Sequence, residues 1–386
     1  MSKPYPQKSR PAPVKWGWIA LLIALLALSI TSCQKATEEP DSHLMYVGTY
    51  TKGQSKGIYR CILQADGSFR KPELAAQTSN PSFLALSKNN QYLLAVNEVD
   101  QQGTGLLESY RIHNDSLQLI NSRFSGGAHP CFIEVNDAGF VLVANYTGGN
   151  VGLLKINQNG KLSKRWHVQQ HVGEGTTKRQ EKPHAHSARF EPGGNGIVSA
   201  DLGTNELWFS RLDTVKKELV PSDPSKISMS AGAGPRHLEF HPTQPWLYVI
   251  NELNSTVTLL HKLSDGHYDV QGTSSTLPDG YKGDNLCAEI DVSADGRYVY
   301  ASNRGHNSIA IFAADLKNGH LSLVGHQDTH GNWPRNFSLT PGGRYLVVAN
   351  QRSNNMVSFR RNPEKGTLKY QDETQIGSPV CIVFEN

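Results

Sequence analysis

The sequence is dominated by a segment that repeats along most of its length. Each copy begins at a Pro or small residue, runs through a short apolar alternation, turns, and enters a second apolar run that ends in Asn. The copies begin at Pro81, Pro130, Ala185, Pro235, Cys287 and Pro334. The copy at Ala185 is weaker, and Asp201 replaces its Asn. A period of roughly 45–55 residues is typical of propeller blades or repeat arrays rather than of isolated domains.

The repeats carry the patterns of β-strands. Apolar alternation is clear in residues 83–86 and 298–300, and continuous apolar runs such as 141–144 are typical of strands covered on both faces. Turn signals such as Asp295-Gly296 separate these runs. No helical periodicity persists for three turns. The sequence therefore predicts an all-β fold.

Two incomplete segments at the ends of the chain predict how this fold closes. Residues 377–384 supply only the first strand of a further repeat, and the part that this repeat lacks matches residues 45–62. Pairing of the two ends would complete one more blade and leave no exposed sheet edge. We therefore expect residues 43–386 to form a single seven-bladed β-propeller, closed by pairing of its N- and C-terminal strands.

The first 32 residues do not share the repeat. A basic start precedes an apolar run, residues 16–30, that is too short to span a bilayer comfortably. The run ends in Ile30-Thr31-Ser32-Cys33, which resembles the lipobox of bacterial lipoproteins. The resemblance implies a signal peptide over residues 1–32 and, over residues 33–42, a lipidated Cys33 with a polar tether. The expected location is the cell envelope, lipid-anchored to the inner or outer membrane. The alternative is a simple anchor or secretory signal with an accidental Cys.

Removal of residues 1–32 changes the charge balance. It takes away four Lys and Arg and no acidic residue, so 34 basic and 34 acidic side chains remain. A domain without net positive charge lacks the excess of basic residues that nucleic-acid-binding proteins use to bind phosphates. We therefore expect no nucleic-acid partner, and contact with the membrane only through the lipid. Apart from Cys33, the four Cys of the domain lie outside metal-ligand spacing, and the three in the first-strand part of the repeat, Cys131, Cys287 and Cys381, are expected to be small buried side chains.

One repeat combines two specific motifs. Residues 232–237 are Gly-Ala-Gly-Pro-Arg-His, and residues 251–255 are Asn-Glu-Leu-Asn-Ser. With His186-Ser187-Ala188, Asn303-Arg304 and Pro334-Arg335 in other repeats, they resemble the lactonase family of seven-bladed propellers. That family includes propeller-type 6-phosphogluconolactonases and carboxy-cis,cis-muconate cyclases, and the resemblance extends over essentially the whole mature chain.

Polar residues at equivalent positions of different repeats are expected to meet at one rim of the central channel. His186, Arg236 and Arg335 follow the first-strand Pro position, while Glu252 and Arg304 follow the Asn that ends the second run. Inner strands of propeller blades line the channel. Cations gathered with a carboxylate suit an anionic small molecule that presents a carbonyl to attack.

These residues and the family resemblance give the expected site. The expected catalytic residues are His186, Arg236, Glu252 and Arg304, and the expected substrate-binding residues are His184, His237 and Arg335. Glu252 or His186 would activate water, and the Arg groups would bind an anion and stabilise the oxyanion. Of the two His residues on the third repeat, His184 and His186, only one is expected to face the channel. Structural ion pairs and turn contacts are the alternative roles.

The expected reaction is hydrolysis of a lactone, either 6-phosphogluconolactone-like or another sugar lactone, by water in the central channel. No cofactor or metal is expected. His184, His186 and His237 could in principle bind zinc, but their spacing in the sequence does not match that of a zinc site. Two alternatives remain open: a muconate-type lactonizing cycloisomerase, and a non-catalytic propeller that binds a ligand or partner. An envelope location would favour a lactone other than the cytosolic phosphorylated one.

Overall fold

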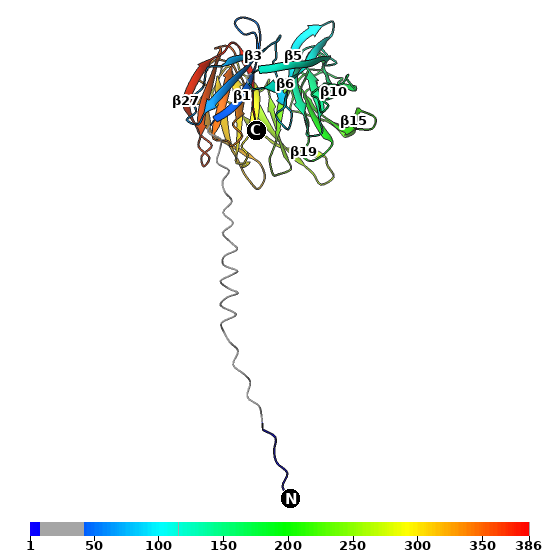
Figure 1. Ribbon diagram of the computed structural model, residues 1–386, viewed down its shortest axis with the longest axis vertical. Coiled ribbons are helices and arrows are strands. Elements are labelled where there is room, and N and C mark those ends of the chain that lie inside the picture. The colour runs from blue at the N-terminus through cyan, green and yellow to red at the C-terminus, as the bar shows by residue number, and fades with distance from the viewer. Residues whose placement is uncertain (8–41, 115, 386) are drawn as a thin grey trace. The chain divides into compact units, whose positions relative to one another are not determined.

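The computed structural model describes residues 1–7, 42–114 and 116–385. The expected signal segment from residue 8 onward, Cys33 and the tether up to residue 41 lie outside the described residues. In the described part of the chain no helix is long and apolar enough to cross a membrane. The described residues from 42 onward are all-β, and their strands form seven four-stranded sheets (Figure 1).

Each sheet is antiparallel. Six sheets are meanders of consecutive strands, each built from one repeat, and the seventh combines the two ends of the propeller. The innermost strands are β4 (Leu84–Leu86), β8 (Pro130–Val135), β12 (Ala185–Phe190), β16 (Pro235–Phe240), β20 (Leu286–Val292), β24 (Pro334–Leu339) and β28 (Pro379–Phe384). The second strands are β5 (Tyr92–Gln101), β9 (Phe140–Asn145), β13 (Gly196–Asp201), β17 (Trp246–Asn251), β21 (Tyr298–Arg304), β25 (Tyr345–Asn350) and β1 (Ser42–Thr49).

Two outer strands complete every sheet. The third strands are β6 (Thr104–His113), β10 (Asn150–Lys155), β14 (Glu206–Asp213), β18 (Thr256–Lys262), β22 (Ser308–Ala314), β26 (Asn355–Arg361) and β2 (Gly57–Gln64). The fourth strands are β7 (Ser116–Phe124), β11 (His167–Gln170), β15 (Glu218–Ser228), β19 (Tyr268–Ser275), β23 (Leu321–Asp328), β27 (Leu368–Gln375) and β3 (Glu73–Gln77).

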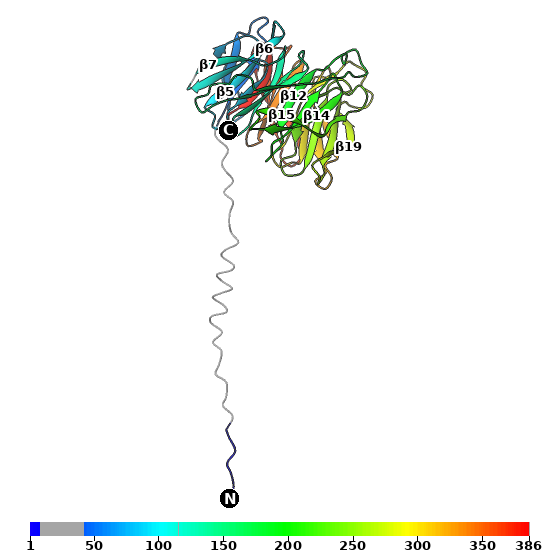
Figure 2. The same ribbon diagram turned by 90° about the vertical axis from the view of Figure 1, so that its right-hand side faces the viewer.

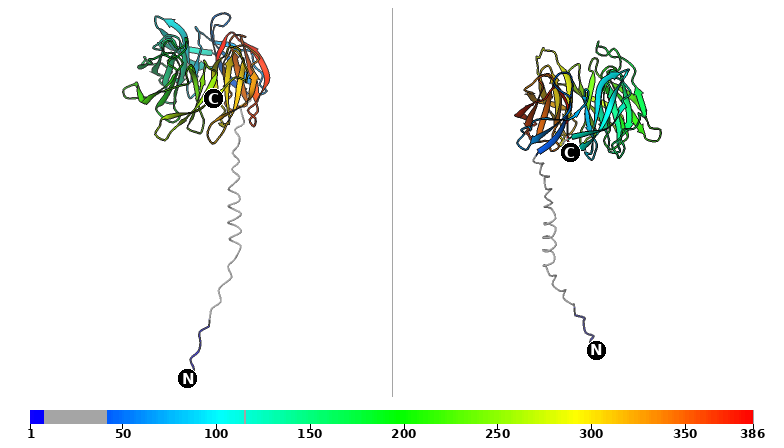
Figure 3. Two further views of the ribbon diagram at one scale, coloured as in Figure 1. Left: turned by 180° about the vertical axis from the view of Figure 1, so that it is seen from behind. Right: turned by 45° about the horizontal axis from the view of Figure 1, so that its top comes forward.

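The ring closes through the two ends of the propeller, as the split repeat predicted. β1 pairs antiparallel with β28, with Tyr46 opposite Val383 and Val47 opposite Ile382. The blue N-terminal strand lies beside the red C-terminal strands in Figure 1, and the views in Figures 2 and 3 show the same ring of sheets from other sides. First strands of neighbouring sheets contact one another around the whole ring, from β4 to β28 and back to β4. The expected closed seven-bladed propeller is confirmed.

The core lies between the sheets. Seven apolar clusters of buried residues each draw on two neighbouring sheets, so there is one at every junction. This is why the second strands are continuously apolar: both of their faces are covered. The four Cys of the described residues are buried and unpaired, which confirms the expected burial of the three in the first strands.

The Asn that ends the second strand fixes the loops beside the central axis. The Nδ2 atom of Asn350 donates to the carbonyl of Thr329 at 3.0 Å, and that of Asn303 donates to the carbonyl of Thr276 at 2.8 Å. These bonds tie the end of the second strand to the segment that enters the same sheet. The residue after the Asn is therefore held at a constant place in each blade.

Candidate active site

Residues that follow the second-strand Asn gather around one cavity at the axis of the propeller. The cavity has a volume of about 370 Å³. Six of the seven sheets supply the residue at this position to the cavity wall. Five of the six follow an Asn and Tyr50 follows Thr49; the six are Tyr50, Glu98, Tyr146, Glu252, Arg304 and Gln351. In the remaining sheet the position holds Leu202, which does not line the cavity. Repetition of one backbone geometry thus turns six separate sequence positions into a single site.

The first strands contribute a second set of residues. Cys131, His186 and Arg335 each stand at the second position of a first strand, and all three line the cavity. Arg236 occupies the equivalent position but lies behind the cavity wall and is only 2% exposed. Of the predicted residues, His186, Glu252, Arg304 and Arg335 therefore line one cavity.

Glu252 is the charged centre of this arrangement. Its Oε2 atom accepts a hydrogen bond from Arg236 Nε at 3.1 Å and pairs with Arg304 Nη2 at 2.9 Å. Its Oε1 atom accepts from Arg179 Nη2 at 2.9 Å. Burial alone would raise the pKa of the Glu252 carboxyl, but the surrounding guanidinium groups, Arg304 foremost, lower that pKa to about 2. Glu252 is thus ionised at any physiological pH, with both oxygens engaged.

Arg179 reaches the cavity from a loop, and one buried carboxylate anchors both ends of that loop. Asp201 Oδ2 lies 2.7 Å from His171 Nδ1 at the start of the loop, and Asp201 Oδ1 accepts from the backbone N–H of His184 at 2.8 Å at its end. Next to Arg179, the Gln180 amide donates to the carbonyl of Leu202 at 2.9 Å. The Asp that replaces Asn in the third repeat therefore positions a cationic side chain over the cavity.

His186 is a buried, neutral imidazole at the cavity wall. Its Nδ1 atom lies 3.7 Å from Cys131 Sγ, and its ring meets the His237 ring edge-on at 5.2 Å. Burial, followed by the charges of Arg236, His237 and Arg335, holds the pKa of His186 well below its usual value. A neutral imidazole has an unprotonated ring nitrogen that can accept a proton, and the same neighbouring charges disfavour the imidazolium that results.

A second buried carboxylate orients the residues behind the wall. His237 Nδ1 lies 2.7 Å from Glu289 Oε1, and its Nε2 accepts from Arg236 Nη1 at 3.2 Å. Burial lowers the pKa of His237 to about 4, although Glu289 opposes the shift. Asn336 donates to the other oxygen of Glu289. His237 and Arg236 thus form a fixed support beneath Glu252 rather than part of the cavity surface.

His184 also lies away from the cavity wall. Its ring stacks on Tyr146 with centroids 4.4 Å apart, and its Nδ1 donates to the Tyr146 carbonyl at 3.1 Å. Of the two His residues on this repeat, only His186 lines the cavity. Strand alternation does not separate them, because residues two apart share a face; His184 precedes β12, and the register of that strand shifts between Ala185 and Ser187. His184 orients Tyr146, whose hydroxyl accepts from Arg179 Nη2 at 3.1 Å.

Of the three Arg side chains that line the cavity, Arg335 makes the fewest ion pairs and hydrogen bonds within the described residues. Its guanidinium lies over the Tyr50 ring, 5.3 Å from the centroid, and Tyr50 in turn donates to Glu98 Oε2 at 2.8 Å. Among the described residues, no carboxylate lies within ion-pair distance of the Arg335 guanidinium. Its donors are therefore open to an anion in the cavity.

The sequence prediction missed several lining residues, and they differ in whether a signal was present. Tyr50, Glu98 and Tyr146 follow the Asn position or its equivalent, so aligning the repeats would have found them. Glu98 follows Asn97 as Glu252 follows Asn251, and both line the cavity. Arg179 and Trp333 come from loops outside the repeated strands, and no pattern marks them.

The charges of the site are unequal. Three guanidinium groups, those of Arg179, Arg304 and Arg335, line the cavity with two carboxylates, Glu98 and Glu252. Behind the wall, the charge of Arg236 is matched by that of Glu289. Within the described residues no group of three or more His, Cys, Asp and Glu side chains is placed to hold a metal ion. The site is thus a cationic cavity with a neutral imidazole in its wall.

The fold is a seven-bladed β-propeller, and the charged cavity on its axis is the candidate active site. The family model described as "Lactonase, 7-bladed beta-propeller" matches residues 44–384. The chain belongs to this lactonase family, and it is a hydrolase of the lactonase class.

Relatives of known name support the same assignment. The chain is 37% identical over 348 residues to a 6-phosphogluconolactonase of Bacillus subtilis, an alignment that covers 89% of this chain and 98% of the relative. It is 34% identical to a 6-phosphogluconolactonase of Formosa agariphila over 84% of this chain and 94% of the relative. Among solved structures, a periplasmic gluconolactonase of Pseudomonas aeruginosa superposes with a TM-score of 0.85 at 31% identity, covering 89% of this chain and 99% of that one.

Proposed function

We propose that this protein hydrolyses an anionic sugar lactone by direct attack of water in the central cavity, without a metal ion, and with His186 as the general base. The observation that carries the proposal is the juxtaposition of a neutral, buried His186 with an excess of guanidinium groups around one cavity. Lactone hydrolysis needs a base for the water and positive charge for the oxyanion, and this cavity offers both.

The charge of the cavity favours an anionic substrate. An incoming phosphate or carboxylate would offset the excess of guanidinium charge, and Arg335 and Arg304 offer planar donors suited to either group. The relatives are named for 6-phosphogluconolactone and gluconolactone. We therefore place the substrate among the six-membered aldonolactones, with an anionic form preferred over a neutral one. At the cell envelope, away from the phosphorylated lactone of the cytosol, that form would be a carboxylated lactone.

The proposed reaction proceeds in two steps. First, His186 takes a proton from water while the water oxygen bonds to the lactone carbonyl carbon, and the carbonyl oxygen gains the negative charge that the guanidinium groups stabilise. Second, the tetrahedral species collapses, and the bond between the carbonyl carbon and the ring oxygen breaks. The ring oxygen takes the proton from His186, which gives the open-chain hydroxy acid and returns the neutral imidazole.

Glu252 is assigned a positioning role rather than the role of base. Its pKa of about 2 makes it a weak proton acceptor, and its two oxygens already bind three guanidinium groups. Arg236 is buried against Glu252 and His237, so we assign it the same kind of role. The lining guanidinium groups of Arg179, Arg304 and Arg335 remain to contact substrate.

The test is acid release from a panel of lactones. The chain from residue 34 onward contains every strand of the propeller and is the protein to assay. The panel comprises 6-phosphogluconolactone, gluconolactone, galactonolactone and a carboxylated lactone, before and after dialysis against a chelator. We expect turnover of at least one lactone, insensitivity to the chelator, and a loss of about 100-fold or more in His186→Gln. Arg335→Met should mainly raise KM for the anionic lactones.

Two outcomes would overturn the proposal. Absence of turnover on the whole panel would leave a binding propeller, and loss of activity on chelation would place a metal in the reaction. A third comparison separates substrate classes: equal kcat/KM for gluconolactone and its phosphate would refute the anionic preference while leaving the hydrolysis intact.

We also propose that the domain is anchored to the cell envelope through a lipid on Cys33. The basis is the order of basic start, apolar run and lipobox-like segment in residues 1–33. The relative named a periplasmic gluconolactonase lies in that compartment by its name, which supports an envelope location for this activity.

A further inference from the structure

One carboxylate of the central cavity has no cationic partner. Glu98 lines the cavity, and its Oε2 atom accepts from the Tyr50 hydroxyl at 2.8 Å, while its Oε1 atom makes no hydrogen bond within the described residues. In that same part of the chain, the ion pairs at the cavity all use Glu252, and none reaches Glu98. One oxygen of Glu98 is therefore open to a hydrogen-bond donor that the chain does not supply.

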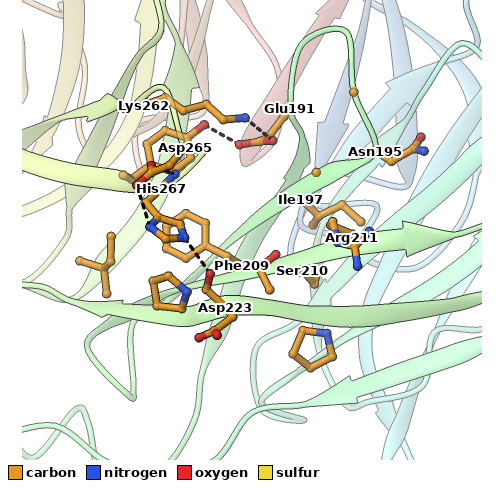
Figure 4. A pocket seen from close by; sticks show the side chains of 18 residues that line it. Glu191, Asn195, Ile197, Phe209, Ser210, Arg211, Asp223, Lys262, Asp265 and His267 are labelled. Atoms are coloured by element: carbon orange, nitrogen blue, oxygen red, sulfur yellow. Dashed lines mark hydrogen bonds and ion pairs between the residues drawn. The ribbon is translucent and has the colours of Figure 1, made fainter.

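Two other carboxylates that line cavities of this fold engage both of their oxygens. Glu252 does so with three guanidinium groups. Glu191 lines a separate cavity of about 500 Å³ (Figure 4), where Lys262 Nζ lies 2.7 Å from one of its oxygens and the Tyr268 hydroxyl donates to the other at 2.6 Å. Glu98 differs from both in its unused oxygen, which points to a partner that enters the central cavity.

A second polar group of the cavity wall is also unpaired. Gln351 lines the cavity, and its Oε1 atom is buried without a hydrogen-bond partner in the described structure. Its backbone N–H donates to the Trp333 carbonyl at 3.0 Å, which holds the residue at the wall. A buried amide oxygen without a partner is unfavourable until a donor reaches it. The amide of Gln351 offers a ligand both an acceptor and donors.

These two groups lie on one side of the cavity. The first strands contact one another in the order β24, β28, β4, so Gln351, Tyr50 and Glu98 come from three successive sheets. His186 and Glu252 come from the sheets of β12 and β16, which are the two sheets farthest from that of β28 around the ring. The unpaired groups therefore lie across the cavity from the proposed base.

This arrangement fits the hydroxyl groups of a sugar lactone. In a six-membered aldonolactone, the carbon atoms across the ring from the carbonyl carry hydroxyl groups, each of which can donate one hydrogen bond and accept others. With the carbonyl at His186, these hydroxyls lie toward Glu98 and Gln351. A carboxylate without a cationic partner repels a second anion but accepts strong hydrogen bonds from neutral hydroxyls.

We propose, on the basis of the lactone hydrolysis proposed above, that Glu98 and Gln351 bind the ring hydroxyls of the substrate. The enzyme then selects polyhydroxylated lactones over lactones that lack these hydroxyls. The unsubstituted ring is rejected because it leaves the polar groups of the wall unpaired. Glu98 is thereby a specificity-determining residue, and His186 keeps the role of base.

The test compares two lactams, which keep the shape of the lactone ring but resist hydrolysis: gluconolactam, with ring hydroxyls, and valerolactam, without them. Isothermal titration calorimetry on the purified protein should show that the parent binds gluconolactam at least about 10-fold more tightly than valerolactam. Glu98→Gln keeps the bond from Tyr50 but removes the charge of the acceptor, so it should weaken gluconolactam binding about 10-fold. Gln351→Met should weaken it about 3–10-fold. Neither variant should change valerolactam binding.

Glu385→Gln is the matched control. Glu385 also accepts from a Tyr hydroxyl, that of Tyr46 at 3.2 Å, but it does not line the cavity. This variant carries the same chemical change outside the site. It should bind both lactams like the parent.

Turnover separates recognition from chemistry. Glu98→Gln should lower kcat/KM about 10-fold for gluconolactone and leave kcat/KM for δ-valerolactone unchanged, with the acid limb of the pH profile in place. The proposal is wrong if the parent binds both lactams equally, if Glu98→Gln binds gluconolactam like the parent, or if it weakens both lactams equally. Equal loss of activity on both lactones, or loss of the acid limb, would also overturn it, because Glu98 would then act in the chemistry.

Failure of hydrolysis is distinguishable from failure of the hydroxyl site. If no lactone is hydrolysed while gluconolactam binding still depends on Glu98, the hydroxyl site stands and the proposed reaction is wrong. Should Glu98→Gln fail to fold, Gln351→Met against Glu385→Gln decides alone.

Discussion

Replacing Glu252 by Gln tests whether this carboxylate holds the site together. The side chain is 3% exposed, and its single negative charge is shared by Arg236, Arg304 and Arg179. Gln keeps the size but removes the charge, which leaves the buried Arg236 and Arg304 without their counterion. Breaking a buried ion pair by removing one partner costs about 3–5 kcal/mol of the free energy of unfolding.

That cost translates into a measurable change in melting temperature. The entropy of unfolding is about 2.1 cal/mol/K per residue, so a propeller of about 340 residues has about 0.7 kcal/mol/K. Dividing the cost by this entropy gives a fall in Tm of about 4–7 °C. The lactonase rate should fall as well, because Arg304 and Arg179 lose the group that orients them.

Glu98→Gln is the matched control for this experiment. Glu98 occupies the same repeat position and lines the same cavity, but its side chain accepts from the Tyr50 hydroxyl, a bond that an amide oxygen also accepts. Its Tm should stay within about 1–2 °C of the parent, the range of a change of 1 kcal/mol or less. Both variants would be followed by differential scanning calorimetry and by acid release. The reasoning is refuted if Glu252→Gln melts like the parent, or if both variants lose the same stability.

Three further predictions follow from the fold and the sequence. Deleting residues 377–386 removes β28, which closes the ring, so the domain should fail to give a cooperative melting transition; a truncated protein that melts like the parent would refute the closure. Cys33→Ala should abolish incorporation of a lipid tracer in cells while the propeller stays folded, and equal labelling of variant and parent would contradict the lipoprotein proposal. Stability should decrease as the pH falls from about 6.5 to about 4, because the fold disfavours protonation of His237 and the unfolded chain binds that proton first; it should decrease again between about 4.5 and about 2, where Glu252 remains ionised only in the fold. A flat dependence of Tm on pH in the upper window would argue against a neutral, buried His237.

The blades and their closure were predictable because each repeat carries its own strand and turn signals. The split repeat at residues 45–62 and 377–384 was enough to pair the two ends of the chain. The strand positions that face the axis were predictable for the same reason: Glu252 and Arg304 follow the same Asn in different repeats.

The sequence did not show which hydrogen bonds and ion pairs the side chains of the site form with one another. Arg236 has the same repeat position as His186 and Arg335, yet Glu252 and the carbonyl of Ala288 hold it behind the wall. Arg179 lies in a loop whose path depends on Asp201. This carboxylate, at the end of a strand, contacts residues at both ends of the loop that precedes its sheet. Such choices are decided by packing and charge around the cavity, and repeat alignment carries no signal for them.

The pH dependence of lactone hydrolysis tests the role of His186 most directly. The base must be unprotonated to act, so kcat/KM should stay constant from pH 8 to below 6.5 and fall only where the free enzyme's depressed His186 pKa is reached. The acid limb of kcat should lie at higher pH than that of kcat/KM, because a bound anion offsets the guanidinium charges that lower this pKa. His186→Gln should lack the limb altogether and retain only a small residual rate. An acid limb that persists unchanged in His186→Gln would show that another group is the base, and would contradict the mechanism.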